Sequence, residues 1–204
     1  NWNHDSSWDG GTAPNGNDDV AIFGDVISMT RTAFTDTAVT VSSIQFDNPN
    51  KYIIAGLGTL NLEAANGTAE IEVIQGNHEF QVAVILNGPT HVGVPTGSSL
   101  VFNNTLNLAG STLVKLGGGD LMFNHRLSTG GGTVSIREGT VSGSGVVAGD
   151  VVNAGGILAP GTSSRLSETV PEPGTFWLTL IGAALLIRRG RRRDVTGLIA
   201  RNSY

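Results

Sequence analysis

The sequence predicts an all-β protein: a right-handed parallel β-helix, which is a solenoid of stacked coils, followed by a single C-terminal transmembrane helix. Three observations favour this fold class. Apolar and polar residues alternate, a five-residue motif recurs, and an uncharged apolar stretch precedes an arginine cluster near the C-terminus. Alternation with a period of two is typical of β-strands. An antiparallel β-sandwich or jelly roll uses the same alternation and remains the alternative.

The strands are expected between residues 20 and 160. Gly, Asn, Ser and Pro separate the apolar runs and supply the corners between strands. No apolar spacing long enough for a helix occurs before residue 174. The alternating apolar residues are Leu60 and Leu62, Ile71 and Val73, Phe80 with Val82 and Val84, Leu106 and Leu108, Leu121 and Phe123, and Val134 and Ile136.

The spacing of the recurring five-residue motif indicates the coil length. GTLNL, NTLNL and GTVSI carry Thr59, Thr105 and Thr133, which lie 46 and 28 residues apart. This spacing suits coils of about 20 to 25 residues, or roughly five or six coils in all. In residues 143–161, strands of two or three residues are joined by single Gly or Asn corners. Antiparallel strands this short hardly pair, which favours the solenoid.

Composition and charge exclude several classes of protein. The 204 residues include no cysteine, which excludes disulfide-stapled and cysteine–zinc folds, and 39% hydrophobic residues, which is enough for a core. Residues 1–173 hold 6 Lys and Arg against 16 Asp and Glu, a net charge of −10, whereas residues 174–204 carry +5. An acidic body without a basic stripe is a poor partner for nucleic acid.

The strand pattern and the charge distribution divide the chain into four parts. We predict an extracellular β-helix-like domain at 1–165, a linker at 166–174, a transmembrane helix at 175–187 and a basic cytoplasmic tail at 188–204. The 13 residues of the helix span about 20 Å against about 30 Å of hydrocarbon, so the anchor is marginal. The positive-inside rule keeps the arginines in the cytoplasm and the acidic body on the far side. The membrane-orienting basic cluster is Arg188, Arg189, Arg191, Arg192 and Arg193.

The order of features in this tail resembles the PEP-CTERM sorting signal of Gram-negative bacteria. The triplet Pro171, Glu172 and Pro173 comes first, and the apolar stretch and the arginine cluster follow. The resemblance implies an inner-membrane exosortase that cleaves near the triplet and delivers the protein to the cell surface or the extracellular polysaccharide matrix. The family usually ends at or just after its basic cluster, whereas this sequence continues over 194–204.

Two stretches of the body carry a second resemblance. GSGVVAGDVVNAGGILAPGTSS, from Gly143, resembles the closing coils of autotransporter-type β-helices. GGTAPNGNDDVAIFG, from Gly10, resembles the start of proteins with autotransporter-associated β-strand repeats. Export is therefore expected, although the sequence shows no leader: a basic segment followed by an apolar run is missing at Asn1. Either the leader was removed or the sequence is a fragment.

The residues that could carry chemistry do not form a recognised catalytic or metal-binding pattern. The histidines lack metal-ligand spacing, and His78 shares the inward parity of Phe80, which favours a hydrogen-bonded core role. Gly117–Asp120 resembles one unit of a calcium-binding glycine repeat, but such sites need tandem copies, so a turn is expected. We therefore predict no cofactor and no metal. The four histidines are His4, His78, His91 and His125.

Paired carboxylates are the one enzymatic lead, because parallel β-helices often cleave polysaccharides with clustered acids. Glu70 and Glu72 are two residues apart and share an outward face, and Asp18 and Asp19 lie side by side near the first strand. Basic and aromatic partners are scarce, so these acids are interpreted as a solvated face. We predict a non-enzymatic surface or matrix protein; a glycan-binding or glycan-cleaving β-helix with the same tail is the alternative.

Overall fold

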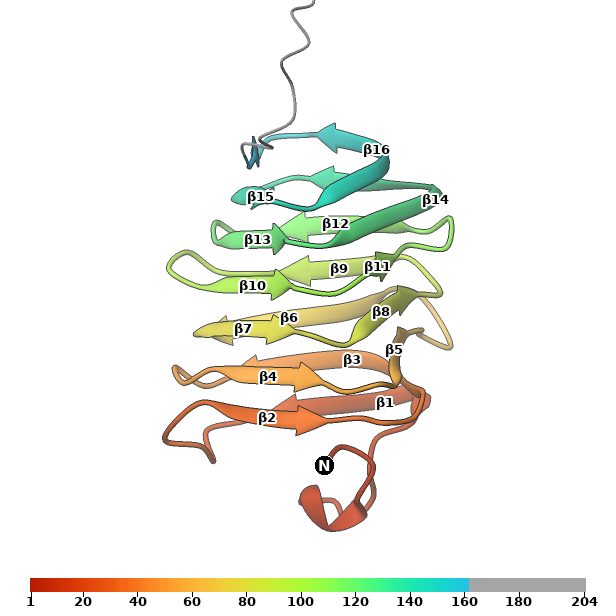
Figure 1. Cartoon of the computed structure of the whole chain (residues 1–204), viewed down its shortest axis with the longest axis vertical. Coiled ribbons are helices and arrows are strands. Elements are labelled where there is room, and N and C mark those ends of the chain that lie inside the picture. Colours follow the sequence, from red (N-terminus) through yellow and green to blue (C-terminus); the bar gives the residue numbers. More distant parts are fainter. Residues whose placement is uncertain (162–204) are drawn as a thin grey trace, which may run out of the picture. The chain divides into compact units, whose positions relative to one another are not determined.

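The computed structural model describes residues 1–161. Within this range the chain forms one short 3-10 helix, η1 (Asp5–Ser7), and 17 strands. All pairings are parallel, and the strands stack as a β-solenoid of about seven turns (Figure 1). The solenoid prediction is therefore confirmed in place of the antiparallel sandwich. The expected transmembrane helix at 175–187 lies outside the described residues.

Two parallel sheets run the length of the stack. The seven-stranded sheet consists of β2 (Arg31–Phe34), β4 (Tyr52–Ala55), β7 (Asn77–Phe80), β10 (Ser99–Phe102), β13 (Asp120–Phe123), β15 (Thr140–Gly143) and β17 (Ile157–Pro160). The ten-stranded sheet consists of β1 (Gly16–Phe23), β3 (Val39–Asp47), β5 (Thr59–Leu62), β6 (Ala69–Gln75), β8 (Ala83–Leu86), β9 (Thr90–Gly93), β11 (Leu106–Asn107), β12 (Thr112–Leu116), β14 (Arg126–Ile136) and β16 (Val146–Asn153).

The ten-stranded sheet bends around a corner of the coil. The long strand β3 pairs with both β5 and β6, and β14 pairs with both β11 and β12. The middle turns use two short strands where β3 and β14 use one long strand. Each turn therefore presents three runs of extended chain, one in the seven-stranded sheet and two in the ten-stranded sheet.

The register gives the length of a turn. Paired residues in neighbouring turns are separated by as few as 17 positions, between Thr140 and Ile157, and as many as 28, between Asp47 and Gln75. The expected 20 to 25 residues lie in the middle of this range. The expectation of five or six coils was too low, because strands extend from Gly16 to Pro160 and the last turn is short.

The three copies of the five-residue motif occupy only partly equivalent positions in the coil. Thr59 lies opposite Ala83, and Leu106, which follows Thr105, lies opposite Val84, so the 46-residue spacing covers two turns. Thr133 instead pairs with Thr112 on the other run of the ten-stranded sheet. The 28-residue spacing therefore separates threonines on two different runs of the sheet, and sequence similarity alone could not distinguish these runs.

Inward side chains form ladders along the stack. Phe80, Phe102 and Phe123 occupy one column in three successive turns, with ring centroids 5.0 and 5.6 Å apart. All three are buried. Because the strands stack at about 4.8 Å, like side chains in one column meet at van der Waals distance. Such aromatic pairs contribute about 0.5–1.5 kcal/mol beyond the area that they bury.

The two ends of the described stack differ. At the N-terminal end, Trp2 and Trp8 pack on Phe23 with ring centroids 5.6 Å away, and Trp2 is 1% exposed. At the other end, Val147 and Leu158 are exposed, although their partners Leu127 and Val141 in the turn below are buried. In the described chain, an aromatic cap therefore covers only the first turn.

Candidate functional site

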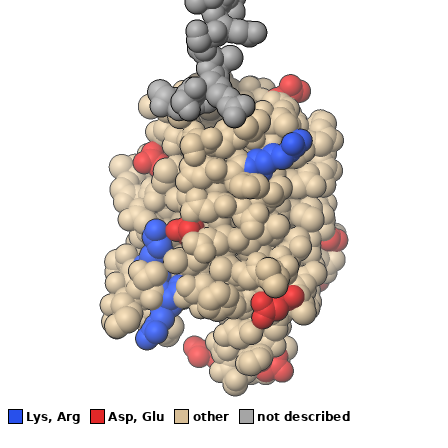
Figure 2. All heavy atoms as spheres, in the orientation of Figure 1, with Lys and Arg blue, Asp and Glu red and all other residues tan. Residues whose placement is uncertain are grey.

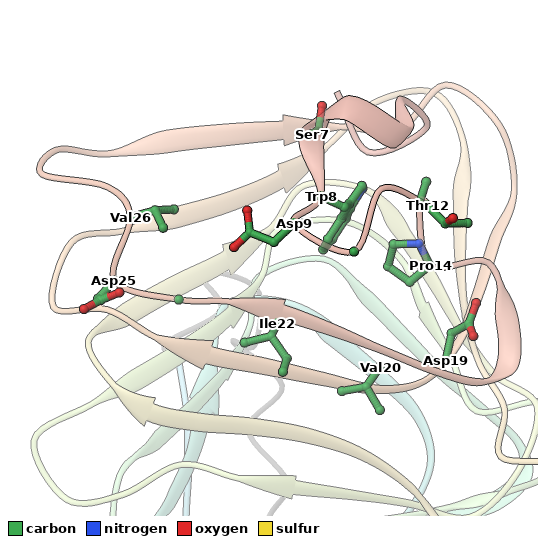
Figure 3. A pocket seen from close by; sticks show the side chains of 13 residues that line it. Ser7, Trp8, Asp9, Thr12, Pro14, Asp19, Val20, Ile22, Asp25 and Val26 are labelled. Carbon is green, nitrogen blue, oxygen red and sulfur yellow. The ribbon is translucent and has the colours of Figure 1, made fainter.

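A groove of about 640 Å³ lies at the N-terminal end of the stack (Figure 3). Residues 1–14, called the N-terminal segment, form one wall with Trp8 and Asp9. Strand β1 and the loop after it form the other wall with Asp19, Ile22 and Asp25. We call this hollow the acidic groove.

Two tryptophan hydrogen bonds fix the N-terminal segment above the first turn. The indole N–H of Trp2 donates to the carbonyl of Pro14 at 2.9 Å, and the indole N–H of Trp8 donates to the carbonyl of Trp2 at 2.7 Å. The backbone N–H of Trp2 donates to the carbonyl of Phe34 at 2.7 Å. These bonds place the ring of Trp8 against the cap and leave it half-buried in the wall of the groove.

Carboxylates dominate the charge of the acidic groove. Asp19 Oδ2 accepts a hydrogen bond from the backbone N–H of Asn15 at 2.8 Å. Burial raises the pKa of Tyr52, whose hydroxyl donates to the Gly24 carbonyl at 2.7 Å, and the negative charge of Asp25 adds to this rise. Figure 2 shows acidic atoms around this end of the molecule and basic atoms along one side of it, on a surface that is otherwise largely uncharged.

The predicted carboxylate pair lies elsewhere. Glu70 and Glu72 are exposed on the outward face of β6, as the alternation predicted, with His91 and Gly93 opposite them on β9. Asp18 and Asp19 lie at the start of β1, and Asp19 alone of these four acids lines the groove. The structure does not bring the two acidic pairs together into one site.

The histidines also separate in space. His78 is fully buried, with its ring stacked on Phe46 at 4.6 Å. Its Nδ1 accepts from the backbone N–H of Tyr52 at 3.1 Å and its Nε2 lies 2.8 Å from the carbonyl of Gln75, so Nε2 carries the proton. Burial lowers the pKa of His78, the Gln75 carbonyl opposes this shift, and the charge of Lys51 adds to it. The predicted core role of His78 is confirmed.

The remaining histidines do not gather around His78. His4 is exposed beside η1, and His91 lies on the outward face of β9. His125 Nδ1 lies 3.2 Å from the hydroxyl of Thr105. Among residues 1–161, no group of three or more His, Cys, Asp or Glu has an arrangement that could hold a metal ion.

One buried carboxylate belongs to a polar corner of the coil. Glu79 receives hydrogen bonds of 2.6 Å from both Gln81 and Asn103, and it forms an ion pair of 3.3 Å with Lys51. Burial raises the pKa of Glu79, but these hydrogen bonds and the Lys51 charge outweigh it, so the pKa lies below its ordinary value. Asn124 continues the ladder by donating to Asn103 at 2.9 Å. This corner is fully bonded, which fits a structural role.

Lys115 is a buried amine in an otherwise aliphatic ladder. It lies between Val92 and Ile136 in register and has no exposed surface. Its Nζ donates to the carbonyls of Leu116 at 2.7 Å and Gly117 at the corner. Burial lowers its pKa from 10.5 to about 8, although nearby acidic groups act in the opposite direction.

Sequence reasoning missed both Lys115 and the groove. Lys115 shares the parity of Leu113 in the run STLVKL, and that parity could have placed it inside. The groove had no such signal, because it depends on the N-terminal segment folding back over β1. The turn predicted at Gly117–Asp120 is confirmed: Gly117 has a φ of +74°, and β13 begins at Asp120.

The sorting residues Pro171, Glu172 and Pro173, and the cluster Arg188, Arg189, Arg191, Arg192 and Arg193, lie outside the described residues. Within residues 1–161, no helix is both long and apolar enough to cross a membrane. Comparisons with family models, curated proteins and solved structures found no match to this chain.

Proposed function

We propose that this chain is a non-enzymatic, exported protein of the cell surface or extracellular matrix of a Gram-negative bacterium. The observation that carries the proposal is the order of the C-terminal tail, in which Pro171–Pro173 precede the apolar stretch 175–187 and the arginine cluster. In this proposal an inner-membrane exosortase reads the tail. The marginal length of the apolar stretch suits a temporary anchor.

The described body is compatible with this role. A solenoid in which each turn contacts only its neighbours forms a self-contained unit without disulfides. Its buried side-chain polar atoms all have hydrogen-bond partners within residues 1–161. We also propose that the coil is right-handed, because parallel strands joined by crossovers strongly prefer that hand. An experimental density map of the body would test the hand directly.

The sorting proposal is tested by changing the triplet alone. Replacement of Pro171, Glu172 and Pro173 by alanine in a strain that carries an exosortase is expected to leave the full-length chain in the inner membrane. Cell fractionation and mass spectrometry of the mature C-terminus provide the measurement. A double replacement of Pro89 and Pro95 in the body serves as the control. Unchanged location and an unchanged C-terminus in the triplet variant would refute the sorting proposal.

A second candidate function is glycan binding by the outward face of β6. Glu70 and Glu72 are exposed there, which leaves their carboxylates accessible to sugar hydroxyls. Replacement of both by glutamine should weaken binding to a panel of acidic and neutral polysaccharides. Replacement of the exposed Asp36 and Asp120 by asparagine controls for the change in net charge. Equal binding by both double variants would exclude Glu70 and Glu72 from any glycan site.

A further inference from the structure

We propose that the acidic groove binds an extended, lysine- or arginine-bearing polypeptide segment, which adds as a strand to the open edge of β1. This inference goes beyond the sorting proposal and does not rest on it. Four features of the groove support it: an unpaired strand edge, a matching volume, exposed apolar side chains, and carboxylates without basic partners.

The first feature is the edge itself. Strand β1 ends the ten-stranded sheet, with β3 as its neighbour. Within the described chain, no backbone hydrogen bond joins the N-terminal segment to residues 18–23. The backbone N–H and C=O groups along this edge therefore have no strand partner. Such an edge is a template for another strand, and strand addition is a recurrent way to bind extended peptides.

The second feature is the volume. One residue of a strand occupies about 3.3 Å along the chain, about 4.8 Å between strands and about 10 Å between layers, or roughly 160 Å³. The groove of about 640 Å³ therefore accommodates about four residues. This length matches Val20–Phe23, which pair continuously with β3.

The third feature is the apolar surface beside the edge. Val20 and Ile22 are 51% and 57% exposed, and both line the groove. An added strand would place every second side chain next to this pair. Trp8 contributes aromatic surface from the opposite wall (Figure 3). These contacts give a peptide apolar area to bury in addition to its backbone hydrogen bonds.

The fourth feature is the charge, which selects the class of peptide. Asp19 lies near the start of β1, Asp25 just beyond its end, and Asp9 in the opposite wall. None of the residues that the structure places in the groove lining is a lysine or an arginine. A basic side chain can pair with these carboxylates and can also approach the Trp8 ring, whereas an acidic peptide is repelled.

Two synthetic peptides test the proposal on the full-length chain in nonionic detergent. The first is an acetylated, amidated octapeptide that alternates lysine and threonine, and the second is the same peptide with all eight backbone nitrogens methylated. Calorimetry is expected to show at least about tenfold weaker binding of the methylated peptide, because it cannot complete the strand ladder. Equal affinity for the two peptides would overturn strand addition.

Matched variants test the role of the groove carboxylates. Replacement of Asp9, Asp19 and Asp25 by asparagine should weaken binding of the first peptide about tenfold, as expected for three exposed ion pairs. The same replacement of three exposed acids outside the groove should change it less than about twofold. An equal loss in both triple variants would show only general attraction to an acidic body and would overturn the proposal. The control acids are Asp36, Asp120 and Asp150.

Discussion

At the residue scale, Lys115 shows how a solenoid can bury a charge. Its position in the ladder is one that Val92 and Ile136 fill with aliphatic side chains in the adjacent turns. The amine reaches past the end of the strand to carbonyls at the corner, which replace part of its lost hydration. Burial is nevertheless unfavourable for the ammonium form, and this is why its pKa is lowered to about 8.

This residue predicts a pH dependence of stability. Between pH 8 and 10.5 the unfolded chain holds the Lys115 proton and the folded chain has lost it, so the free energy of unfolding should rise with pH in this window. The rise should approach about 3 kcal/mol. Urea unfolding at several pH values, compared with Lys115→Met, measures it. Parallel curves for the two proteins would contradict the assignment.

A second residue-scale prediction concerns Gly56, which has a φ of +132°. A Cβ atom at this position would collide with the backbone carbonyl of Thr35 in the preceding turn. Gly56→Ala is therefore expected to lower the free energy of unfolding by more than about 1 kcal/mol. Gly67→Ala is the matched control, because Gly67 also has a positive φ but faces open space. Equal losses in urea unfolding would show that the collision is unimportant.

At the element scale, the phenylalanine ladder of β7, β10 and β13 is the clearest unit of stability. Phe102 contacts the ring above and the ring below, so its removal affects three turns. Phe102→Ala should lower the free energy of unfolding by about 3–5 kcal/mol. Val101→Ala, on the half-buried outward face of the same strand, should lower it by less than about 1 kcal/mol. Chemical denaturation distinguishes the two, and similar losses would contradict the ladder.

The element scale also shows what could be predicted from sequence. Alternation identified inward side chains such as Leu60 and Phe80 because a strand has only two faces. Alternation does not say which run of a turn a strand forms, so it could not show that Thr133 lies on a different run from Thr59. The groove could not be foreseen either, because no local pattern in the N-terminal segment encodes its contact with Phe23.

At the scale of the described stack, the difference between its two ends predicts which part of residues 1–161 opens first. The first turn is closed by Trp2 and Trp8, whereas Val147 and Leu158 of the seventh turn are exposed. In a linear stack, a terminal turn has one neighbour and the least interface. Hydrogen exchange should therefore be fastest in β16 and β17 and slower in the capped turns. Uniform exchange along the stack would contradict this view.

The stack also sets a distance. The acidic groove lies at the first turn, and the described chain ends at Gly161, whose N–H donates to the carbonyl of Gly143 beside the last turn. Six intervals of about 4.8 Å separate the first turn from the seventh, or roughly 29 Å. A peptide held in the groove would stand that far from Gly161. Adding or deleting one turn would change the reach of this spacer in steps of about 4.8 Å without altering the groove.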